Sequence, residues 1–394
     1  MTNNASYSNP VVVVGGGFGG LTTALTLSNY SERPPIILIE PRKRFIFLPL
    51  LYELLSDELK AWEVAPFYKT LVSQRGIVLV EQFVEKIDLI DNSVLTSSGE
   101  KIAYGQLVLA TGAKPNNYGI EGVNEYSSTF NRYEDVSEIK QLISKINNST
   151  NYSQDLVIVG AGATGIELAC KISDLLEDRI TIHLIDISER VLLNGKSFNQ
   201  DQAEQALRKR SIQLHLNTRV LKLSENMVEM EKCDINPPEI SCLRHQGLFW
   251  TAGVKASLPD GLNKFLSKDG RLCIDSTLRI SGHDNVFAIG DVALSEECTL
   301  PSNAQIAMQQ GELVAQNIIA NNEGKSSKSF EYVDRGEMLS LGIGEATITG
   351  MGFTLSGSLA FKIRRMAYLS KMPNLSLSVR SVGAWLLSHG EKSI

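Results

Sequence analysis

Short apolar runs alternate with helical patterns along most of this chain. The run Val11–Val14 consists of four β-branched residues, which predicts a strand buried on both faces. A helical pattern over Leu21–Ser28 and a second apolar run at Ile36–Ile39 follow it. Strand, helix and strand in this order are typical of a parallel sheet with helices on its faces, so we expect an α/β fold.

The same succession occurs a second time. The apolar run Leu156–Val159 is followed by a helical pattern over Ile166–Leu176 and by another run at Ile180–Ile185. We therefore expect two α/β domains in one chain. Residues 1–142 and 271–330 would form a first, split domain, and residues 143–270 would form the second, with the polar stretch 143–154 as a linker.

Further patterns fill in these domains. Helical spacing over Ala304–Ile319 predicts a long helix, and apolar runs predict strands at 76–90, 94–96, 107–112, 212–216, 219–223, 248–250 and 286–291. Residues 331–394 differ in character and are assigned to a C-terminal amphipathic region.

A glycine motif follows the first strand. Gly15, Gly17 and Gly20 have the spacing G-x-G-x-x-G, and Glu40 lies 25 residues after Gly15. Glycines at these places permit a tight turn, close approach of a pyrophosphate, and close packing of helix on strand, while the acid accepts hydrogen bonds from a ribose. A glycine turn without a ligand is the alternative, which the strand, the helix and the spaced acid together disfavour.

The second strand carries the same motif. Gly160, Gly162 and Gly165 repeat the spacing, and Asp186 lies 26 residues after Gly160. Two such sites imply two dinucleotides, so the fold expected is α/β with two Rossmann-like dinucleotide-binding domains. We expect FAD as cofactor and NADH or NADPH as co-substrate.

Composition excludes several classes of protein. A net charge of −6 gives no general basic surface, which argues against nucleic acid as a partner. No window of 18 uninterrupted apolar residues occurs, so no spanning helix is expected, and the first ten residues do not have the pattern of a signal peptide. Five cysteines, without a C-x-x-C pair, favour a reducing compartment and predict neither a metal site nor a disulfide.

The tail is basic and amphipathic. Residues 355–394 hold six Lys or Arg against a single acid, Glu391. Apolar residues at 355, 359, 363, 366 and 369 share one helical face, and the cations Lys362, Arg364, Arg365 and Lys371 lie mostly off it. This pattern fits a helix pair in a membrane interface, and fits equally helices docked on the body or on a dimer partner.

The sequence pattern alone leaves the roles of two sets of polar residues open. Asp291 follows the apolar run at 286–290, where it is suited either to a flavin ribityl hydroxyl or to capping a helix. Gln305 and Gln309 are four residues apart and share a helical face, which is either a solvated face or a polar rim of a reactive site.

The set of motifs resembles the type II NAD(P)H:quinone oxidoreductases, a branch of the two-dinucleotide-binding flavoproteins. The matching segments are VVVVGGGFGGL with Glu40, FLPLLYELL, LVLATGA, VIVGAGATGIELA, WTAG, FAIGD and the A-Q-x-A-x-Q of Ala304–Gln309. The tail segments SLGIGEATITG and LSGSLAFKIRRMAYLSKMP are most similar to the cyanobacterial and plastid branch that reduces demethylphylloquinone in phylloquinone synthesis.

This resemblance implies electron transfer from NAD(P)H through FAD to a membrane quinone, without proton pumping. It implies an FAD site at Gly15, Gly17, Gly19, Gly20, Glu40, Thr111, Gly112, Asp291 and Ala304. It implies a nicotinamide dinucleotide site at Gly160, Gly162, Gly165, Asp186 and Gly253, with catalytic roles for Glu167, Gln305 and Gln309. Alternatively, Glu167 is an acidic residue near the N-terminus of a helix, where the helix dipole favours a negative charge.

The resemblance also implies a peripheral membrane protein on the cytoplasmic or stromal face. Residues 355–388 would meet an anionic membrane surface, and a homodimer is a further expectation. The alternatives are a general respiratory reductase of plastoquinone or ubiquinone and a redox-sensing flavoprotein of the apoptosis-inducing type. Sulfide:quinone reductases need redox cysteines near the flavin. That activity is disfavoured here, because Cys170 lies on the helix after the second glycine motif and no cysteine follows Cys298.

Overall fold

The computed structural model describes residues 10–149, 155–295 and 300–373. The chain forms two compact units, and each is described by itself. The first comprises residues up to 45, 66–114 and 254–333, and the second comprises 46–65, 115–253 and 334 onward. The expected domains instead placed 46–65 and 115–142 in the first domain and 254–270 in the second, and treated 331–394 as a region of its own.

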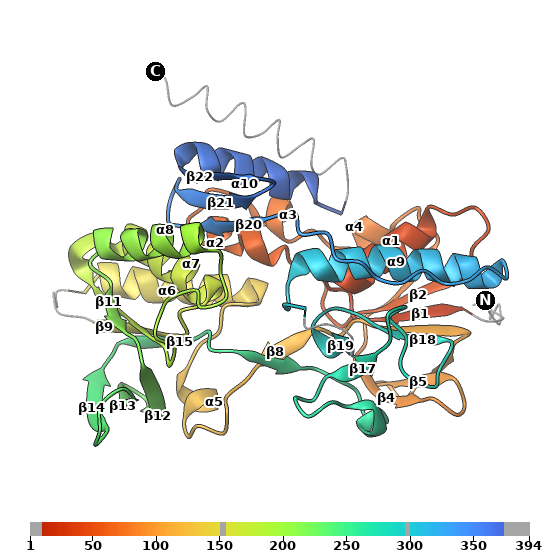
Figure 1. Ribbon diagram of the computed structural model, residues 1–394, viewed down its shortest axis with the longest axis horizontal. Helices are drawn as coiled ribbons and strands as arrows, with labels where there is room; N and C mark the ends of the chain where they lie inside the picture. The colour runs from red at the N-terminus through yellow and green to blue at the C-terminus, as the bar shows by residue number, and fades with distance from the viewer. Residues whose placement is uncertain (1–9, 150–154, 296–299, 374–394) are drawn as a thin grey trace. The chain divides into compact units, whose positions relative to one another are not determined.

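A five-stranded parallel sheet forms the centre of the first unit (Figure 1). Its order is β18 (Val286–Ala288), β7 (Gln106–Leu109), β1 (Val11–Val14), β2 (Ile36–Ile39) and β3 (Ile77–Val80). The side chains of β1 and β2 are fully buried, as expected for an inner strand covered on both faces.

Two helices run side by side in this unit (Figure 1): α1 (Phe18–Ser28) and α9 (Ala304–Asn322). Glycines allow their close approach, because a Cβ at Gly311 would lie 2.5 Å from the carbonyl oxygen of Gly19. The remaining elements are α4 (Tyr68–Val72), β4 (Val84–Asp88), β5 (Ser93–Thr96), β6 (Lys101–Ala103), β8 (Ala113–Pro115), β16 (Val254–Ala256), η3 (Asn263–Phe265), β17 (Leu272–Ile274), η4 (Gly290–Val292) and β19 (Ala293–Ser295).

The second unit repeats the parallel sheet with four strands. Its order is β11 (Gln213–His215), β10 (Thr181–Ile185), β9 (Asp155–Val159) and β15 (Gly247–Trp250). An antiparallel sheet of β12 (Thr218–Ser224), β13 (Met227–Lys232) and β14 (Glu239–Arg244) accompanies it. Helices of this unit are η1 (Leu48–Leu50), α2 (Leu51–Leu55), α3 (Ala61–Val64), α5 (Val123–Tyr126), α6 (Tyr133–Asn147), α7 (Ala163–Leu176), η2 (Glu177–Arg179) and α8 (Ser197–Lys209).

The C-terminal part of the second unit is a small sheet with a helix on it. Strands β20 (Glu337–Ser340), β21 (Ala346–Gly350) and β22 (Phe353–Gly357) are antiparallel, and α10 (Ser358–Ser370) packs on β21 and β22 (Figure 1). The sequence predicts a helix from residue 355, but residues 353–357 form a strand because they pair with β21. The second helical run expected after Pro373 lies outside the described residues.

The expected start of the linker is also wrong. The sequence predicts a linker from residue 143, yet α6 continues to Asn147. The helix persists because Ile139 and Ile146 are buried, which supplies the apolar contact that its polar neighbours do not suggest.

Candidate functional site

The first glycine motif forms a turn whose backbone is hydrogen-bonded to the carboxylate of Glu40. The backbone N–H of Gly16 donates to Glu40 Oε2 at 2.7 Å, and the backbone N–H of Arg42 donates to Glu40 Oε1 at 2.9 Å. The Arg42 guanidinium also closes on this carboxylate, through Nε at 2.7 Å and Nη2 at 3.0 Å. The hydroxyl of Tyr68 donates to the carbonyl of Gly16, and burial raises the pKa of that phenol well above its usual range.

Space around this turn suits a phosphate group. A Cβ at Gly20 would lie 1.9 Å from the carbonyl oxygen of Gly15, so only glycine allows helix and turn to approach this closely. A Cβ at Gly17 would meet no atom within 4 Å, which leaves open room beside the first turn of α1. The geometry of the motif therefore fits a pyrophosphate, as its spacing predicts.

Polar groups at the ends of two other strands complete this candidate site. Thr111 follows β7, and its Oγ1 is buried without a hydrogen-bond partner among the described residues. Gly112 follows it with a positive φ of 68°. Asp291 lies in η4 after β18, where burial raises the pKa of its carboxyl. An orphaned hydroxyl and a partly buried acid at the carboxyl ends of parallel strands are consistent with a bound dinucleotide.

The long helix α9 contributes three glutamines in different ways. Gln310, which the sequence reasoning missed, accepts a hydrogen bond from the backbone N–H of Gly290 at 2.7 Å and so holds the turn before Asp291. The Gln309 amide pairs with both backbone groups of Val333, at 2.9 and 3.0 Å. Gln305 is half-buried on the first turn, beside Ala304 at the helix start. The buried helical face could have indicated the position of Gln310, but not its bond to Gly290.

The second glycine motif repeats the arrangement of the first. The backbone N–H of Ala161 donates to Asp186 Oδ2 at 2.5 Å, and that of Ser188 donates to Asp186 Oδ1 at 2.7 Å. A Cβ at Gly165 would lie 1.8 Å from the carbonyl oxygen of Gly160, whereas one at Gly162 would meet nothing within 4 Å. Each acid thus accepts from the middle residue of its glycine turn and from the residue two positions after itself.

A pocket of about 350 Å³ opens beside this second turn. Its lining comprises Ala161, Gly162, Ala163, Asp186, Ser188, Arg190, Leu192, Leu193, Asn194, Gly195 and Glu337. Of these eleven residues, Gly162 and Asp186 were predicted site residues, and the other nine, among them the polar Ser188, Arg190 and Glu337, were not. Gly253 lies in a separate segment after β15 with a φ of 70°, a backbone conformation that favours glycine.

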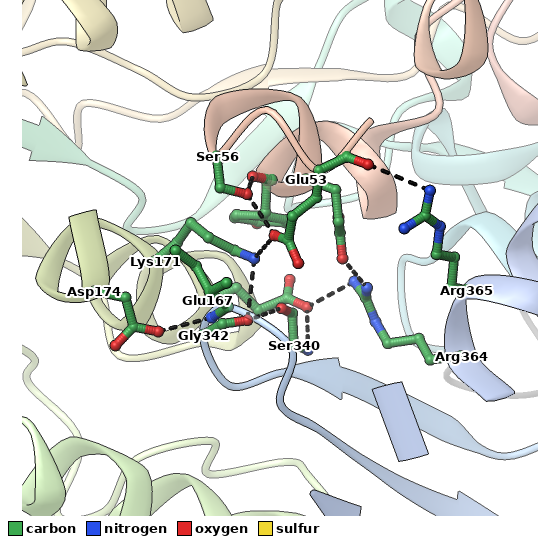
Figure 2. Close-up of polar contacts among 12 residues, drawn as sticks. Glu53, Ser56, Glu167, Lys171, Asp174, Ser340, Gly342, Arg364 and Arg365 are labelled. Atoms are coloured by element: carbon green, nitrogen blue, oxygen red, sulfur yellow. Dashed lines mark hydrogen bonds and ion pairs between the residues drawn. The ribbon is translucent and has the colours of Figure 1, made fainter. Parts of the chain in front are cut away.

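Glu167 belongs to a buried ionic cluster rather than to the lining of that pocket (Figure 2). Its Oε1 accepts from the backbone N–H of Ser340 at 2.7 Å and from Nη2 of Arg364 at 3.2 Å. The same guanidinium forms an ion pair with Glu53 and donates to the carbonyl of Pro49 at 2.6 Å. Two carboxylates thus converge on a single guanidinium. The second oxygen of Glu53, Oε2, is buried without a hydrogen-bond partner among the described residues.

The cluster changes the ionisation of its members. Burial raises the pKa of Glu167 to about 7, although Arg364 and the Ser340 N–H act in the opposite direction and Glu53 adds to the rise. Burial also raises the pKa of Tyr52, whose hydroxyl is hydrogen-bonded to Glu167. The neighbouring carboxylates hold the pKa of Arg364 above its usual range despite burial. Glu167 can therefore hold an exchangeable proton near neutral pH.

Three side chains on one face of α7 bind the end of β20 and the residues that follow it. Glu167 binds Ser340, Lys171 donates to the carbonyl of Gly342 at 3.0 Å, and Asp174 accepts from the backbone N–H of Ile343 at 2.7 Å (Figure 2). The fully buried Lys171 also forms an ion pair with Glu58 at 2.5 Å. Positions i, i+4 and i+7 of a helix lie in one line, which explains the regular match to the segment.

The structure corrects the expected exposure of the tail cations. Arg364 is 1% exposed and Arg365 is 9% exposed, because both turn into the second unit, where Arg365 donates to the carbonyl of Glu58 at 3.3 Å. Leu359, Ile363 and Met366 are instead 57%, 40% and 41% exposed. Three residues of the predicted apolar stripe of α10 are thus exposed, whereas Leu369 of the same stripe is 1% exposed and the two central arginines face inward. No helix in the described part of the chain is long and apolar enough to cross a membrane.

Known proteins place this geometry in a family. A model of the pyridine nucleotide-disulphide oxidoreductase family matches residues 9–311. The chain is 32% identical to the demethylphylloquinone reductase NdbB of Synechocystis sp., over 95% of this chain and 97% of that protein. It is 32% identical to the alternative NAD(P)H-ubiquinone oxidoreductase C1 of Arabidopsis thaliana, over 92% of this chain and 78% of that protein.

A solved structure supports the fold. The NDH2 of Plasmodium falciparum, in complex with NADH, matches with a TM-score of 0.81 at 18% identity and covers 94% of this chain and 96% of that one. The chain therefore belongs to the pyridine nucleotide-disulphide oxidoreductase family and, within it, to the type II NAD(P)H:quinone oxidoreductases. The α/β fold with two Rossmann-like sheets and the family expected from the sequence are confirmed.

Proposed function

We propose that this enzyme reduces a membrane naphthoquinone of the demethylphylloquinone class with electrons from NAD(P)H. The observation that carries the proposal is the duplicated turn, in which Gly16 binds Glu40 and Ala161 binds Asp186. One chain with two such turns is equipped for two dinucleotides, as transfer between a nicotinamide and a second carrier requires.

FAD is assigned to the first site. Gly15, Gly17 and Gly20 would admit its pyrophosphate, Glu40 would fix the turn and face its ribose, and Thr111 and Asp291 would accept or donate hydrogen bonds along its length. Gly19, Gly112 and Ala304 complete the proposed contacts through backbone or close packing. When bound, FAD supplies the two-electron chemistry that joins hydride oxidation to quinone reduction.

The nicotinamide dinucleotide is assigned to the second site. Gly160, Gly162 and Gly165 would admit its pyrophosphate, Asp186 would face its ribose, and Gly253 would let the backbone approach it. Glu167 is proposed as the acid near the reaction: it lies in the buried cluster with Arg364, outside the pocket lining, and burial raises its pKa to about 7, so that about half of it is protonated at neutral pH. Gln305 and Gln309 are proposed as the residues at the quinone end.

The naphthoquinone preference is favoured by the similarity to NdbB and by the tail segments. A benzoquinone is the second candidate, because the Arabidopsis relative named for ubiquinone is equally identical at 32%. We further propose peripheral attachment to the cytoplasmic or stromal face of an anionic membrane through residues 355–388, where such a quinone resides. A homodimer stays a prediction.

Steady-state kinetics test the proposal. NADH and NADPH oxidation should be measured against matched naphthoquinones and benzoquinones, including a demethylated naphthoquinone with a prenyl tail. The expected result is repeated turnover with the highest kcat/KM for the naphthoquinones. A single reduction without turnover would overturn the enzymatic proposal, whereas faster turnover with benzoquinones would replace its substrate class.

A further inference from the structure

We propose that Tyr118 is a further coenzyme-binding residue, whose hydroxyl donates a hydrogen bond to the nicotinamide riboside of NADH or NADPH. This inference deepens the proposed function and rests on it in one respect, the assignment of a pyridine nucleotide to the second glycine motif. It concerns the half of the coenzyme that lies away from Asp186.

The strand order of the second sheet separates the two halves of the coenzyme. Strand β9 lies between β10 and β15, and all three are parallel, so their carboxyl ends meet at one edge. Gly160 follows β9, and Asp186 follows β10. With the pyrophosphate at the glycine turn and the adenosine ribose at the acid, the nicotinamide riboside is directed to the end of β15, on the other side of β9.

The residues that follow β15 adjoin the glycine turn. The Thr251 hydroxyl donates to the carbonyls of Val159 and Gly160, at 2.9 and 3.1 Å. Two residues later, the carbonyl of Gly253 accepts a hydrogen bond from the backbone N–H of Asn116 at 3.2 Å. This bond attaches the segment that begins at Asn116 to the carboxyl edge of the sheet.

Tyr118, in that segment, stands beside Gly253. A Cβ built at Gly253 would lie 2.0 Å from the Tyr118 hydroxyl oxygen, so this oxygen occupies the space next to the glycine backbone. The tyrosine is nevertheless 61% exposed, and its hydroxyl forms no hydrogen bond with the described residues. The hydroxyl is therefore available as a donor to a ligand at this edge.

The backbone of Tyr118 has a conformation that disfavours a bulky side chain. Its φ is 50°, in the left-handed region. Side chains hold this turn, because Asn116 Oδ1 accepts from the N–H of Tyr118 at 3.1 Å and Asn117 Oδ1 accepts from the N–H of Gly119 at 3.2 Å. Such strain is found mainly at functional sites. Since an exposed ring contributes little packing, burial does not offset the strain here, and contact with a ligand accounts for it.

Calorimetry on the FAD-loaded enzyme tests the inference without a quinone. The probes are the oxidised coenzyme, NAD⁺ or NADP⁺ according to which the wild type binds more tightly, and 5′-AMP, which lacks the nicotinamide riboside. Tyr118→Phe removes only the hydroxyl and should weaken coenzyme binding by about two- to tenfold, the range of one hydrogen bond, without changing 5′-AMP binding. The matched control is Tyr126→Phe, at another tyrosine of the same unit that is 45% exposed, and it should change neither.

Two further measurements separate coenzyme binding from a structural role. Tyr118→Gly should change the free energy of unfolding little, because relief of the left-handed strain offsets the greater freedom of glycine in the unfolded chain. It should nevertheless weaken coenzyme binding at least as much as Tyr118→Phe does. In turnover with a water-soluble naphthoquinone, Tyr118→Phe should raise KM for the coenzyme and leave kcat nearly unchanged.

The possible outcomes distinguish this inference from the proposed function. The inference is overturned if Tyr118→Phe binds the oxidised coenzyme as the wild type does, or if it weakens the coenzyme and 5′-AMP equally. A wild-type protein that binds neither probe would overturn the assignment of the second site, and the inference with it. Loss of quinone turnover alone would contradict only the proposed substrate, because the binding results do not depend on a quinone.

Discussion

Glu167 on α7 accepts a hydrogen bond from Arg364 on α10 at 3.2 Å, although 197 residues separate them in the chain. Arg364 is at the same time paired with Glu53, and all three side chains are almost fully buried. The final described helix is thus attached to the second unit by an ionic cluster as well as by apolar contacts. Removal of the Arg364 side chain would leave two carboxylates in a buried site without their counter-charge.

The first prediction concerns that cluster. Arg364→Met should lower the free energy of unfolding by about 3–5 kcal/mol, because it leaves buried carboxylates unpaired. The control is Lys362→Met, which removes the same charge from the exposed side of the same helix and should change stability little. Chemical denaturation of both variants measures the difference. Equal stability of the two variants would show that the cluster contributes nothing to the fold.

The second prediction concerns the pH dependence of stability. The pKa of Glu167 is raised from 4.5 to about 7 in the folded protein. Between these values the folded state holds a proton that the unfolded state has released, so stability should fall as pH rises, by up to about 1.4 kcal/mol per pH unit. Glu167→Gln should flatten this slope, whereas Glu121→Gln, at a side chain that is 73% exposed, should preserve it. Denaturation curves between pH 4.5 and 7 provide the measurement, and an unaltered slope in Glu167→Gln would contradict the assignment.

Local patterns predicted the parallel sheets well. The strands Val11–Val14 and Ile36–Ile39 have the bounds that their apolar runs indicated, and both glycine motifs begin helices as expected. These features depend on residues near one another in the chain, where burial on both faces leaves a continuous apolar run.

Long-range pairing explains what the sequence did not reveal. A helical projection places Arg364 with the polar residues, and only the distant Glu53 and Glu167 make its burial favourable. Similarly, β20 to β22 are too short and mixed in polarity to be distinguished from loops before their pairing is known. The role of Gln310 depends on the folded position of Gly290, which no local pattern gives.

The third prediction tests the FAD site through Thr111. Its hydroxyl is buried without a partner in the described structure, so Thr111→Val should leave the flavin-free protein equally or more stable. The same change should weaken FAD binding by about 1 kcal/mol, the net value of one hydrogen bond. Thr96→Val is the control, because Thr96 is buried in the same unit with its hydroxyl bonded to Ser98. Flavin released by heat and fluorescence titration with FAD measure occupancy. Unchanged affinity in Thr111→Val would remove this residue from the site.

The fourth prediction concerns Asp186. Asp186→Ala should raise the ratio of kcat/KM for NADPH to that for NADH, because it removes the negative charge beside the ribose. It should also raise KM for both coenzymes, since the N–H groups of Ala161 and Ser188 lose their acceptor. Asp201→Ala removes an acid that neighbours Arg190 outside the pocket lining and serves as the control. If the ratio stays constant in Asp186→Ala, the acid does not determine specificity.

The fifth prediction concerns membrane binding by α10, whose exposed residues differ from those expected from the sequence. Leu359, Ile363 and Met366 form its exposed apolar face, and Lys362 and Lys371 are its exposed cations. With Arg364 and Arg365 buried, the electrostatic attraction from this helix is about 2 kcal/mol at roughly 1 kcal/mol per cation, half of what four exposed cations would give. Apolar insertion should therefore contribute the larger share.

Co-sedimentation with lipid vesicles separates the two contributions. Replacing Leu359, Ile363 and Met366 together by Gln should reduce binding to both neutral and anionic vesicles at every salt concentration, because the apolar term is not screened. Replacing Lys362 and Lys371 by Gln should reduce binding only to anionic vesicles and only at low salt, because the charge term is screened. Ile90→Gln, at a 92% exposed position in the turn between β4 and β5, is the control for loss of an exposed apolar side chain and should have no effect. If the triple variant binds as the wild type does, the exposed face of α10 does not contact lipid, and attachment must come from other parts of the chain.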